Sequence, residues 1–230
     1  MGNIIGTRVQ RIDGRQKVTG RAIYGDDILL PHMLHAACRY TDIPCGRIKR
    51  VDFREALSVK GLKAIITYTD IPGKKRIGPI REDHLPLVES EIFYIGDVIA
   101  AVAADSREAA WEACEKIKVD YETIPGVFDI QSALLPGSRL IHPEYKSNIV
   151  VHYPLIKGDV KLGFAQSEKV ITRQYRTGFV EHAYIEPESI TAELDESGLG
   201  FIIRGSIQNP FTTRRMVASF MGVDLNRVNV

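Results

Sequence analysis

The sequence is poor in cysteine, in long apolar runs and in net charge. Its 230 residues include three cysteines and one tryptophan, and 30 basic residues stand against 29 acidic ones. An odd cysteine count without a Cys-x-x-Cys spacing argues against a disulfide framework, a zinc knuckle and a self-contained iron–sulfur site. We therefore predict reduced, structural thiols at Cys38, Cys45 and Cys114. The balanced charge argues against nucleic acid or an anionic membrane as a partner.

The sequence also lacks targeting segments and the common catalytic motifs. No apolar run approaches the roughly 20 residues that cross a bilayer, and the N-terminus has no signal-peptide pattern. We expect a cytoplasmic protein with no membrane partner. G-x-S-x-G, a glycine-rich phosphate loop and H-E-x-x-H are all missing. A hydrophobic share of 44% over this length nevertheless suffices for a core, and for two structural units.

Strands and helices are predicted to mix in the first half. The segment 97–104 is apolar on both faces, which is typical of a central, covered strand. The segment 106–117 carries an apolar stripe at helical spacing that includes Cys114, so this thiol is expected in the core. The other expected elements are a short helix over 52–57 that Asp52 caps, and strands over 33–40, 47–51, 61–68, 91–94 and 118–122.

Polar, turn-rich segments flank this half. Residues 8–27 are interpreted as an extended arm with a turn at Gly25, not as a helix. The basic run at 74–76 is interpreted as a solvated loop in preference to an anion site. Proline and glycine punctuate 126–147, which predicts a linker in which His142 is exposed.

From residue 148 onward the pattern is β-rich. Strands are expected over 149–153, 169–177, 190–194 and 199–203, with a hairpin turn at 195–198. His182 and Glu186 have the i, i+4 spacing of a helical zinc pair. Because Pro187 stops a helix there, we expect hydrogen-bonded polar residues and no metal ligand. The predicted fold class is α+β.

Gln208 is the residue that sequence reasoning singles out. It lies between Gly205 and Pro210, where a strand runs into a helix predicted over 212–221. An uncharged amide can donate and accept hydrogen bonds, which suits contact with a ligand oxygen. Capping of the following helix is the simpler interpretation of this segment taken alone, so both alternatives stay open at this point.

Six short motifs follow one another along the chain: Lys17-Val18-Thr19-Gly20-Arg21, Thr69-Asp70-Ile71-Pro72-Gly73, Tyr94-Ile95-Gly96-Asp97, Val119-Asp120-Tyr121-Glu122, Glu181-His182-Ala183-Tyr184-Ile185-Glu186-Pro187 and Ser206-Ile207-Gln208-Asn209-Pro210. Their order resembles the large subunit of the xanthine dehydrogenase/aldehyde oxidase family, the molybdenum hydroxylases. The resemblance implies an N-terminal arm at 1–19, an α/β hammerhead domain at 20–125, a linker at 126–147, and at 148–230 the β-rich first part of a molybdopterin-binding domain.

The resemblance also implies a function. The family hydroxylates aldehydes, N-heterocycles or purines with oxygen derived from water. Its cofactor is a molybdenum–pterin, as molybdopterin or its cytosine dinucleotide form, and an iron–sulfur cluster and FAD reside on partner subunits or domains. Gln208 matches the glutamine whose amide contacts an oxygen ligand of molybdenum. No catalytic residue matches, because the family's base glutamate does not correspond to Glu181, Glu186 or Glu188.

The family's next motif, a Gly-Gly-Phe-Gly turn, would follow Val230. We therefore expect a fragment or split subunit that needs the remainder of the large subunit, or a second chain, and is not catalytic alone. Two alternatives remain: a non-enzymatic interaction module, and an inactive remnant of the same fold. The fragment interpretation predicts exposed apolar side chains at Phe201, Ile203, Val228 and Val230.

Overall fold

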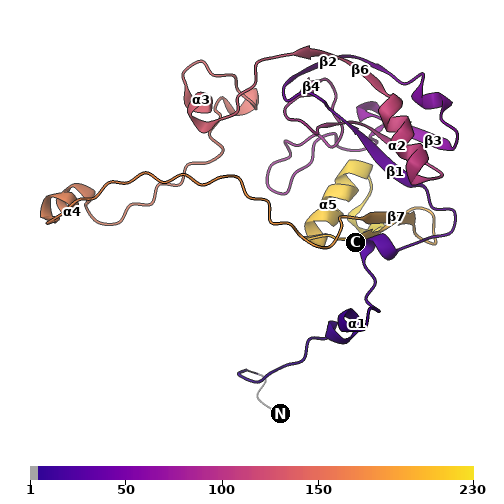
Figure 1. Ribbon diagram of the computed structural model, residues 1–230, viewed down its shortest axis with the longest axis horizontal. Coiled ribbons are helices and arrows are strands. Elements are labelled where there is room, and N and C mark those ends of the chain that lie inside the picture. The colour runs from indigo at the N-terminus through magenta and orange to yellow at the C-terminus, as the bar shows by residue number, and fades with distance from the viewer. Residues whose placement is uncertain (1–4) are drawn as a thin grey trace. The chain divides into compact units, whose positions relative to one another are not determined.

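The computed structural model describes residues 5–230, which divide into two units (Figure 1). One unit joins the N-terminal part of the chain, through Pro125, to Ile185–Val230. The other unit is Gly126–Tyr184. The first unit contains all three β-sheets of the described residues.

The first sheet and one helix enclose the main core. Antiparallel strands β1 (His35–Tyr40), β5 (Val98–Ala104) and β3 (Leu62–Ile66) have the order β1-β5-β3, which confirms that 97–104 is central. Helix α2 (Arg107–Lys116) packs on β1 and β5. Its first turn is capped by Ser106, whose Oγ accepts a hydrogen bond from the Ala109 N–H at 3.1 Å. The predicted stripe is buried at Ala110, Ala113, Cys114 and Ile117.

A second sheet has the order β4-β2-β6, from β4 (Glu91–Ile92), β2 (Gly46–Asp52) and β6 (Lys118–Thr123). The predicted helix over 52–57 is wrong. Asp52 is still part of β2, its carboxylate accepts the Arg54 N–H at 3.0 Å, and only a short 3-10 turn, Ala56–Ser58, follows. An aspartate that closes a local turn competes with the cap of a helix, which explains the difference.

The third sheet follows the second unit in the sequence. Its order is β7-β8-β9, formed by β7 (Ile190–Leu194), β8 (Phe201–Gly205) and β9 (Val228–Asn229). Strand β7 is antiparallel to β8 and β9 is parallel to it, so helix α5 (Pro210–Met221) is the crossover of a β-α-β unit. The 3-10 turn Leu225–Arg227 leads into β9.

None of the four apolar side chains expected to be exposed on this sheet is fully exposed, and two of them are buried. Val228 is 2% exposed and Ile203 is 8% exposed. Both pack with Ala218 of α5, and Phe201 and Val230 are partly buried against the same cluster. The expectation was wrong because the crossover helix covers the face that the strand pattern left open.

Two further differences lie in the arm and in the second unit. Helix α1 (Gly14–Val18) forms within the predicted extended arm, where Lys17 Nζ lies 2.8 Å from the Asp13 carboxylate. The turn predicted at Gly25 is the 3-10 helix Gly25–Asp27. The second unit contains α3 (Ile130–Leu134), the 3-10 helix Pro143–Tyr145 and α4 (Val160–Gln166). Asn148 ties this unit together through hydrogen bonds to the backbones of Ile141, Ala133 and Arg139.

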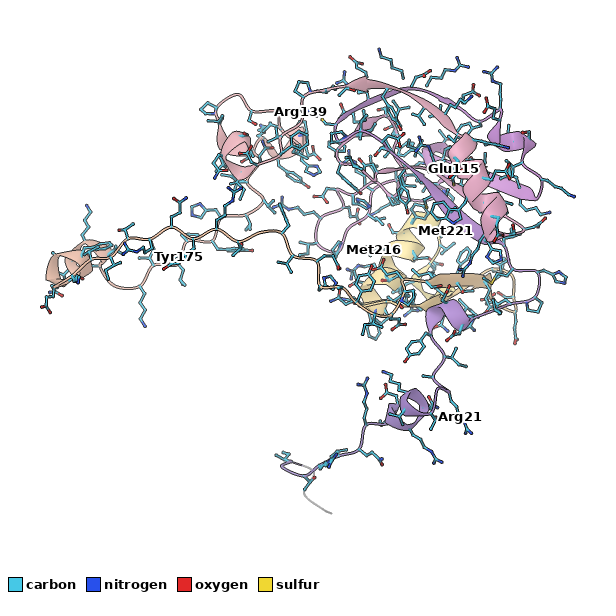
Figure 2. All side chains as sticks on the ribbon, in the orientation of Figure 1. Arg21, Glu115, Arg139, Tyr175, Met216 and Met221 are labelled. Carbon is cyan, nitrogen blue, oxygen red and sulfur yellow. The ribbon has the colours of Figure 1, made fainter. Side chains whose placement is uncertain are left out.

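The strands predicted over 149–153 and 169–177 do not form. No residue of 149–184, all of which the structure describes, belongs to a strand. Their apolar side chains are exposed, as Tyr175 illustrates at 87% (Figure 2). Alternating side chains predict a strand only where a neighbouring strand supplies hydrogen bonds, and none pairs with these segments here.

Candidate functional site

Gln208 lies in the connection between β8 and α5. Gly205, the last residue of β8, lies so close to the chain that a Cβ on it would be 2.1 Å from the Ser189 carbonyl oxygen. Only glycine permits this approach. The Ser206 N–H then donates to the same carbonyl at 3.2 Å. The strand side of the connection is therefore fixed by backbone contact.

Polar side chains fix the same side of the connection. The Ser206 hydroxyl donates a hydrogen bond to Glu186 Oε1 at 2.8 Å. Glu186 is thus hydrogen-bonded, as the sequence predicted. His182, by contrast, is exposed, with Nδ1 at 3.7 Å from Glu181 Oε1. Among residues 5–230 no three His, Cys, Asp or Glu side chains gather into a possible metal site.

Asn209, not Gln208, is the cap of α5. Its Oδ1 accepts the Thr212 N–H at 3.2 Å, and Pro210 supplies the first helical residue. Gln208 is exposed, and its amide makes no hydrogen bond to any residue that the structure describes. The simpler alternative for Gln208, helix capping, is therefore wrong, because the neighbouring amide performs that task.

The C-terminal end of α5 is also fixed by backbone hydrogen bonds. Gly222 adopts a left-handed conformation, φ 66°, and its N–H returns to the carbonyls of Ala218 and Ser219. Two backbone N–H groups from a distant loop, of Gly73 and Lys74, donate to Phe220 and Ser219 at 2.9 Å each. This loop was predicted to be solvated, and that prediction is wrong for Lys75, which is half-buried.

Arg214 links α5 to the last strand. Its Nε donates to the Val228 carbonyl at 2.7 Å and to the Leu225 carbonyl at 3.1 Å. No local pattern in the sequence indicates this contact, which depends on β9 returning beside β8. The helix that follows Gln208 is thus tied to the sheet as well as to the loop.

Two of the three cysteines, Cys45 and Cys114, are buried, and Cys38 is half-buried on β1. No disulfide joins any of the three, which all lie among the described residues, and Cys114 is 3% exposed. Burial raises the pKa of the Cys114 thiol to about 11, so the thiolate that a nucleophile needs is suppressed. The prediction of structural thiols is confirmed for Cys114 and Cys45, which are both buried.

A cleft of about 860 Å³ lies elsewhere in the first unit. The segment that precedes β1 forms one side, and α2 and β7 form the others, with Trp111 exposed along it. Arg107, its basic residue, is paired with Asp26 at 2.6 Å. Gln208 is not among the residues that line this cleft, so the cleft is separate from the candidate site.

Two family models match the chain. Residues 19–125 match the aldehyde oxidase and xanthine dehydrogenase a/b hammerhead domain, and residues 141–230 match the molybdopterin cofactor-binding domain. Members of this family carry a molybdenum–pterin cofactor, with iron–sulfur and FAD groups on other domains or subunits. Among the described residues, no helix has the length and apolar character needed to cross a membrane.

Relatives of known name agree with these models. The nicotinate dehydrogenase large molybdopterin subunit of Eubacterium barkeri is 32% identical over 99% of this chain and 53% of its own length. A probable xanthine dehydrogenase subunit of Bacillus subtilis is 31% identical over 96% of this chain and 29% of its own length. The chain thus spans about half the length of one relative and less than a third of the other.

Solved structures agree as well. Aldehyde oxidoreductase from Desulfovibrio gigas superimposes with a TM-score of 0.88 at 29% identity, over 95% of this chain and 25% of that one. Quinoline 2-oxidoreductase from Pseudomonas putida 86 gives a TM-score of 0.85 at 26% identity, over 97% of this chain and 29% of that one. The chain therefore belongs to the xanthine dehydrogenase and aldehyde oxidase family of molybdenum hydroxylases, and comprises the α/β hammerhead domain and the start of the molybdopterin cofactor-binding domain.

Proposed function

We propose that this chain is part of an enzyme that hydroxylates an aldehyde, an N-heterocycle or a purine, and that Gln208 contacts an oxygen ligand of its molybdenum. The relatives support the substrate classes, since their names refer to nicotinate, xanthine and aldehyde. The state of the Gln208 amide supports the contact. It is exposed and unpaired within residues 5–230, on a connection whose two ends are fixed.

The chemistry of an amide fits this task. A molybdenum centre with oxo and sulfido ligands is anionic, so a carboxylate at this position would be repelled and an ammonium would perturb its charge. The Gln208 amide can donate a hydrogen bond through Nε2 without bringing a charge. Ser206 and Asn209, one on each side, hold the connection through Glu186 and Thr212, so the backbone that carries the Gln208 side chain is fixed by contacts of this chain.

When bound, the molybdenum–pterin supplies the oxygen transfer and takes up the electrons. The residues of this chain would orient and hold the cofactor. Gln208 would fix an oxygen ligand, while Gly205 and Asn209 fix the backbone on either side of it. A base for the substrate and further contacts to the pterin come, in this proposal, from outside the chain.

The proposed enzyme is larger than these 230 residues. The chain spans 53% and 29% of the two relatives described above. We infer that it works together with the remainder of a large subunit or a second chain that completes it. Iron–sulfur and FAD subunits or domains would carry the electrons, as in other members of the family.

The experiment compares two neighbouring amides in the complete enzyme. Gln208→Ala is expected to lower kcat by about tenfold to a hundredfold, the usual effect of losing a group beside a metal ligand, with little change in Tm. Asn209→Ala is the matched control, because it removes the helix cap and is expected to cost about 0.5–2 kcal/mol of stability.

Steady-state kinetics and thermal unfolding measure the two effects. If Gln208→Ala leaves kcat unchanged and lowers Tm, the amide has a structural role and the proposal fails. The Mo(V) signal in electron paramagnetic resonance gives a second readout, since loss of a hydrogen bond to a ligand oxygen should shift its parameters.

A further inference from the structure

The C-terminus of α5 rests on the loop Tyr68–Lys75, which comes from the first half of the chain. A short 3-10 helix, Tyr68–Asp70, begins this loop. Asp70 Oδ2 accepts the Thr67 N–H at 2.7 Å and the Thr67 hydroxyl at 2.8 Å. The bond from this N–H holds the pKa of Asp70 below its ordinary value. The start of the loop is therefore closed by its own side chains.

Lys75 closes the other side of the loop. Its Nζ donates to the carbonyls of Ile71 at 2.6 Å and Tyr68 at 2.9 Å, and lies 5.1 Å from the centre of the Tyr68 ring. Ile71 itself is 4% exposed. The Tyr68 carbonyl also accepts the Ile71 N–H at 3.4 Å, so the Lys75 cation adds a second donor to the hydrogen bond of the turn and binds the Ile71 carbonyl beside it.

Gly73 is the point at which the loop meets the helix. A Cβ there would lie 2.2 Å from the Ser219 carbonyl oxygen, 2.4 Å from the Gly222 nitrogen and 2.6 Å from the Phe220 carbonyl oxygen. All three are backbone atoms, which cannot move aside as a side chain can. Any residue but glycine would push the loop away from the end of α5, which Met221 marks in Figure 2.

The contact reaches Gln208 through the helix itself. Helix α5 has 12 residues, so its two ends are about 18 Å apart at 1.5 Å per residue. Asn209 caps one end, next to Gln208, and the Gly73 and Lys74 N–H groups cap the other. A helix transmits a tilt at one end to the other, and a displacement of about 1 Å at a reacting centre can cost a hundredfold in rate.

We propose that the loop Tyr68–Lys75 positions the Gln208 amide by holding the far end of α5, with Gly73 and Lys75 as its positioning residues. This inference rests on the proposed contact between Gln208 and the molybdenum centre. In this proposal, a loop outside the molybdopterin-binding domain helps to set the position of a residue in the site.

Hydrogen exchange in the cofactor-free full-length protein tests the mechanical link. Gly73→Ala and Lys75→Met should both speed amide exchange over 216–221 and also over 207–212, about tenfold or more. Gly178→Ala is the matched control for the first, since a Cβ there would meet nothing within 4 Å. Lys60→Met, at an exposed lysine, is the control for the second. Lys75→Arg keeps the charge and the donors and should restore most of the protection.

Kinetics of the holoenzyme test the functional link. Gly73→Ala and Lys75→Met should lower kcat by about tenfold or more and change KM less. In a Gln208→Ala background the same changes should lower kcat by less than about twofold, because the group they position is already gone. A merely structural loop would instead give equal losses in both backgrounds.

Three results are decisive. Faster exchange confined to 216–221, with 207–212 unaffected, would overturn the inference, as would equal kcat losses in both backgrounds. If Gly73→Ala yields no folded protein, the milder Lys75→Met and its arginine rescue carry the test alone. An inert Gln208→Ala variant would sink the proposed function itself, a different result from additive losses, in which Gln208 matters and the loop does not act through it.

Discussion

Two adjacent amides divide the work at the β8–α5 connection. Asn209 has the short side chain that reaches back to the Thr212 N–H, and its carbonyl group is consumed by that bond. Gln208 is one methylene longer and one residue earlier, and its amide makes no hydrogen bond to any residue that the structure describes. This division leaves the neutral Gln208 amide available for the contact with an oxygen ligand that we propose.

The thiol of Cys114 gives a prediction at the residue scale. Its pKa is raised by burial to about 11 in the folded chain, against 9.0 for an unperturbed thiol. The unfolded state therefore loses its proton first, and the stability associated with this thiol is lost as pH rises from about 9 to 11. The unfolding free energy of the wild type should fall more steeply over that window than that of Cys114→Ala.

Urea unfolding at several pH values from about 8 to 11 measures this difference. Lysines and tyrosines titrate over the same range, but they do so in both proteins and cancel in the comparison. Parallel slopes in the two proteins would mean that Cys114 is accessible to solvent when folded, against its 3% exposure.

At the residue scale, sequence reasoning succeeded where the neighbouring sequence contains a clear local pattern. The apolar stripe placed Cys114 in the core, and the Gly–Pro frame drew attention to Gln208. It failed for Lys75, whose basic neighbours suggested solvent exposure. The three carbonyls that surround its Nζ belong to a turn whose shape no local pattern reveals.

Among the elements, α2 and β5 hold the main core together. Ile117, the C-cap of α2, is 1% exposed and packs with the buried residues of β5. Ile117→Ala should therefore cost about 2–5 kcal/mol, the sum of lost burial and a residual cavity. Ile66→Ala, on β3 and 42% exposed, is the control and should cost less than about 1 kcal/mol.

Trp111, the single tryptophan, lies on α2 and reports this core by its fluorescence. Urea unfolding curves of the two variants give the comparison. Equal midpoints for Ile117→Ala and Ile66→Ala would show that α2 contributes little to the stability of the first unit.

Elements were predicted well where the signal is local and poorly where it depends on a partner. The residues of α2 themselves encode its apolar stripe and its serine cap. The residues of β5 likewise encode a strand that is apolar on both faces. The segments 149–153 and 169–177 alternate in the same way, yet a strand forms only against another strand. Helix α1 was missed although Asp13 and Lys17, whose charged groups lie 2.8 Å apart, have the i, i+4 spacing of a helical ion pair.

At the scale of the whole molecule, the described residues form only one side of the proposed cofactor site. Gln208 is the residue of this chain proposed to face the cofactor, and the chain spans 53% and 29% of the two relatives described above. The isolated 230-residue chain is therefore expected to bind no stoichiometric molybdenum and to show no hydroxylase activity. Its folded state should nonetheless form, because two buried hydrophobic clusters are built from residues of this chain.

Metal analysis of the purified chain, with circular dichroism as the check on folding, measures this expectation. Expression in a host that makes the molybdenum–pterin cofactor is the required condition. A molar ratio of molybdenum to protein close to unity would contradict it, and would mean that the chain contacts the cofactor at many more points than Gln208.

The bond between the Gly73 loop and the end of α5 restricts how these enzymes can be recombined. The two family models match separate segments of the chain, 19–125 and 141–230. This separation suggests that the two domains could be exchanged between relatives. Yet Gly73 and Lys74 supply donors to a helix that lies far along the chain, in the second of these stretches. A chimaera that takes its hammerhead domain from one relative and its next domain from another would pair a loop and a helix from different proteins at this contact. The loop and the helix should therefore be taken from the same relative.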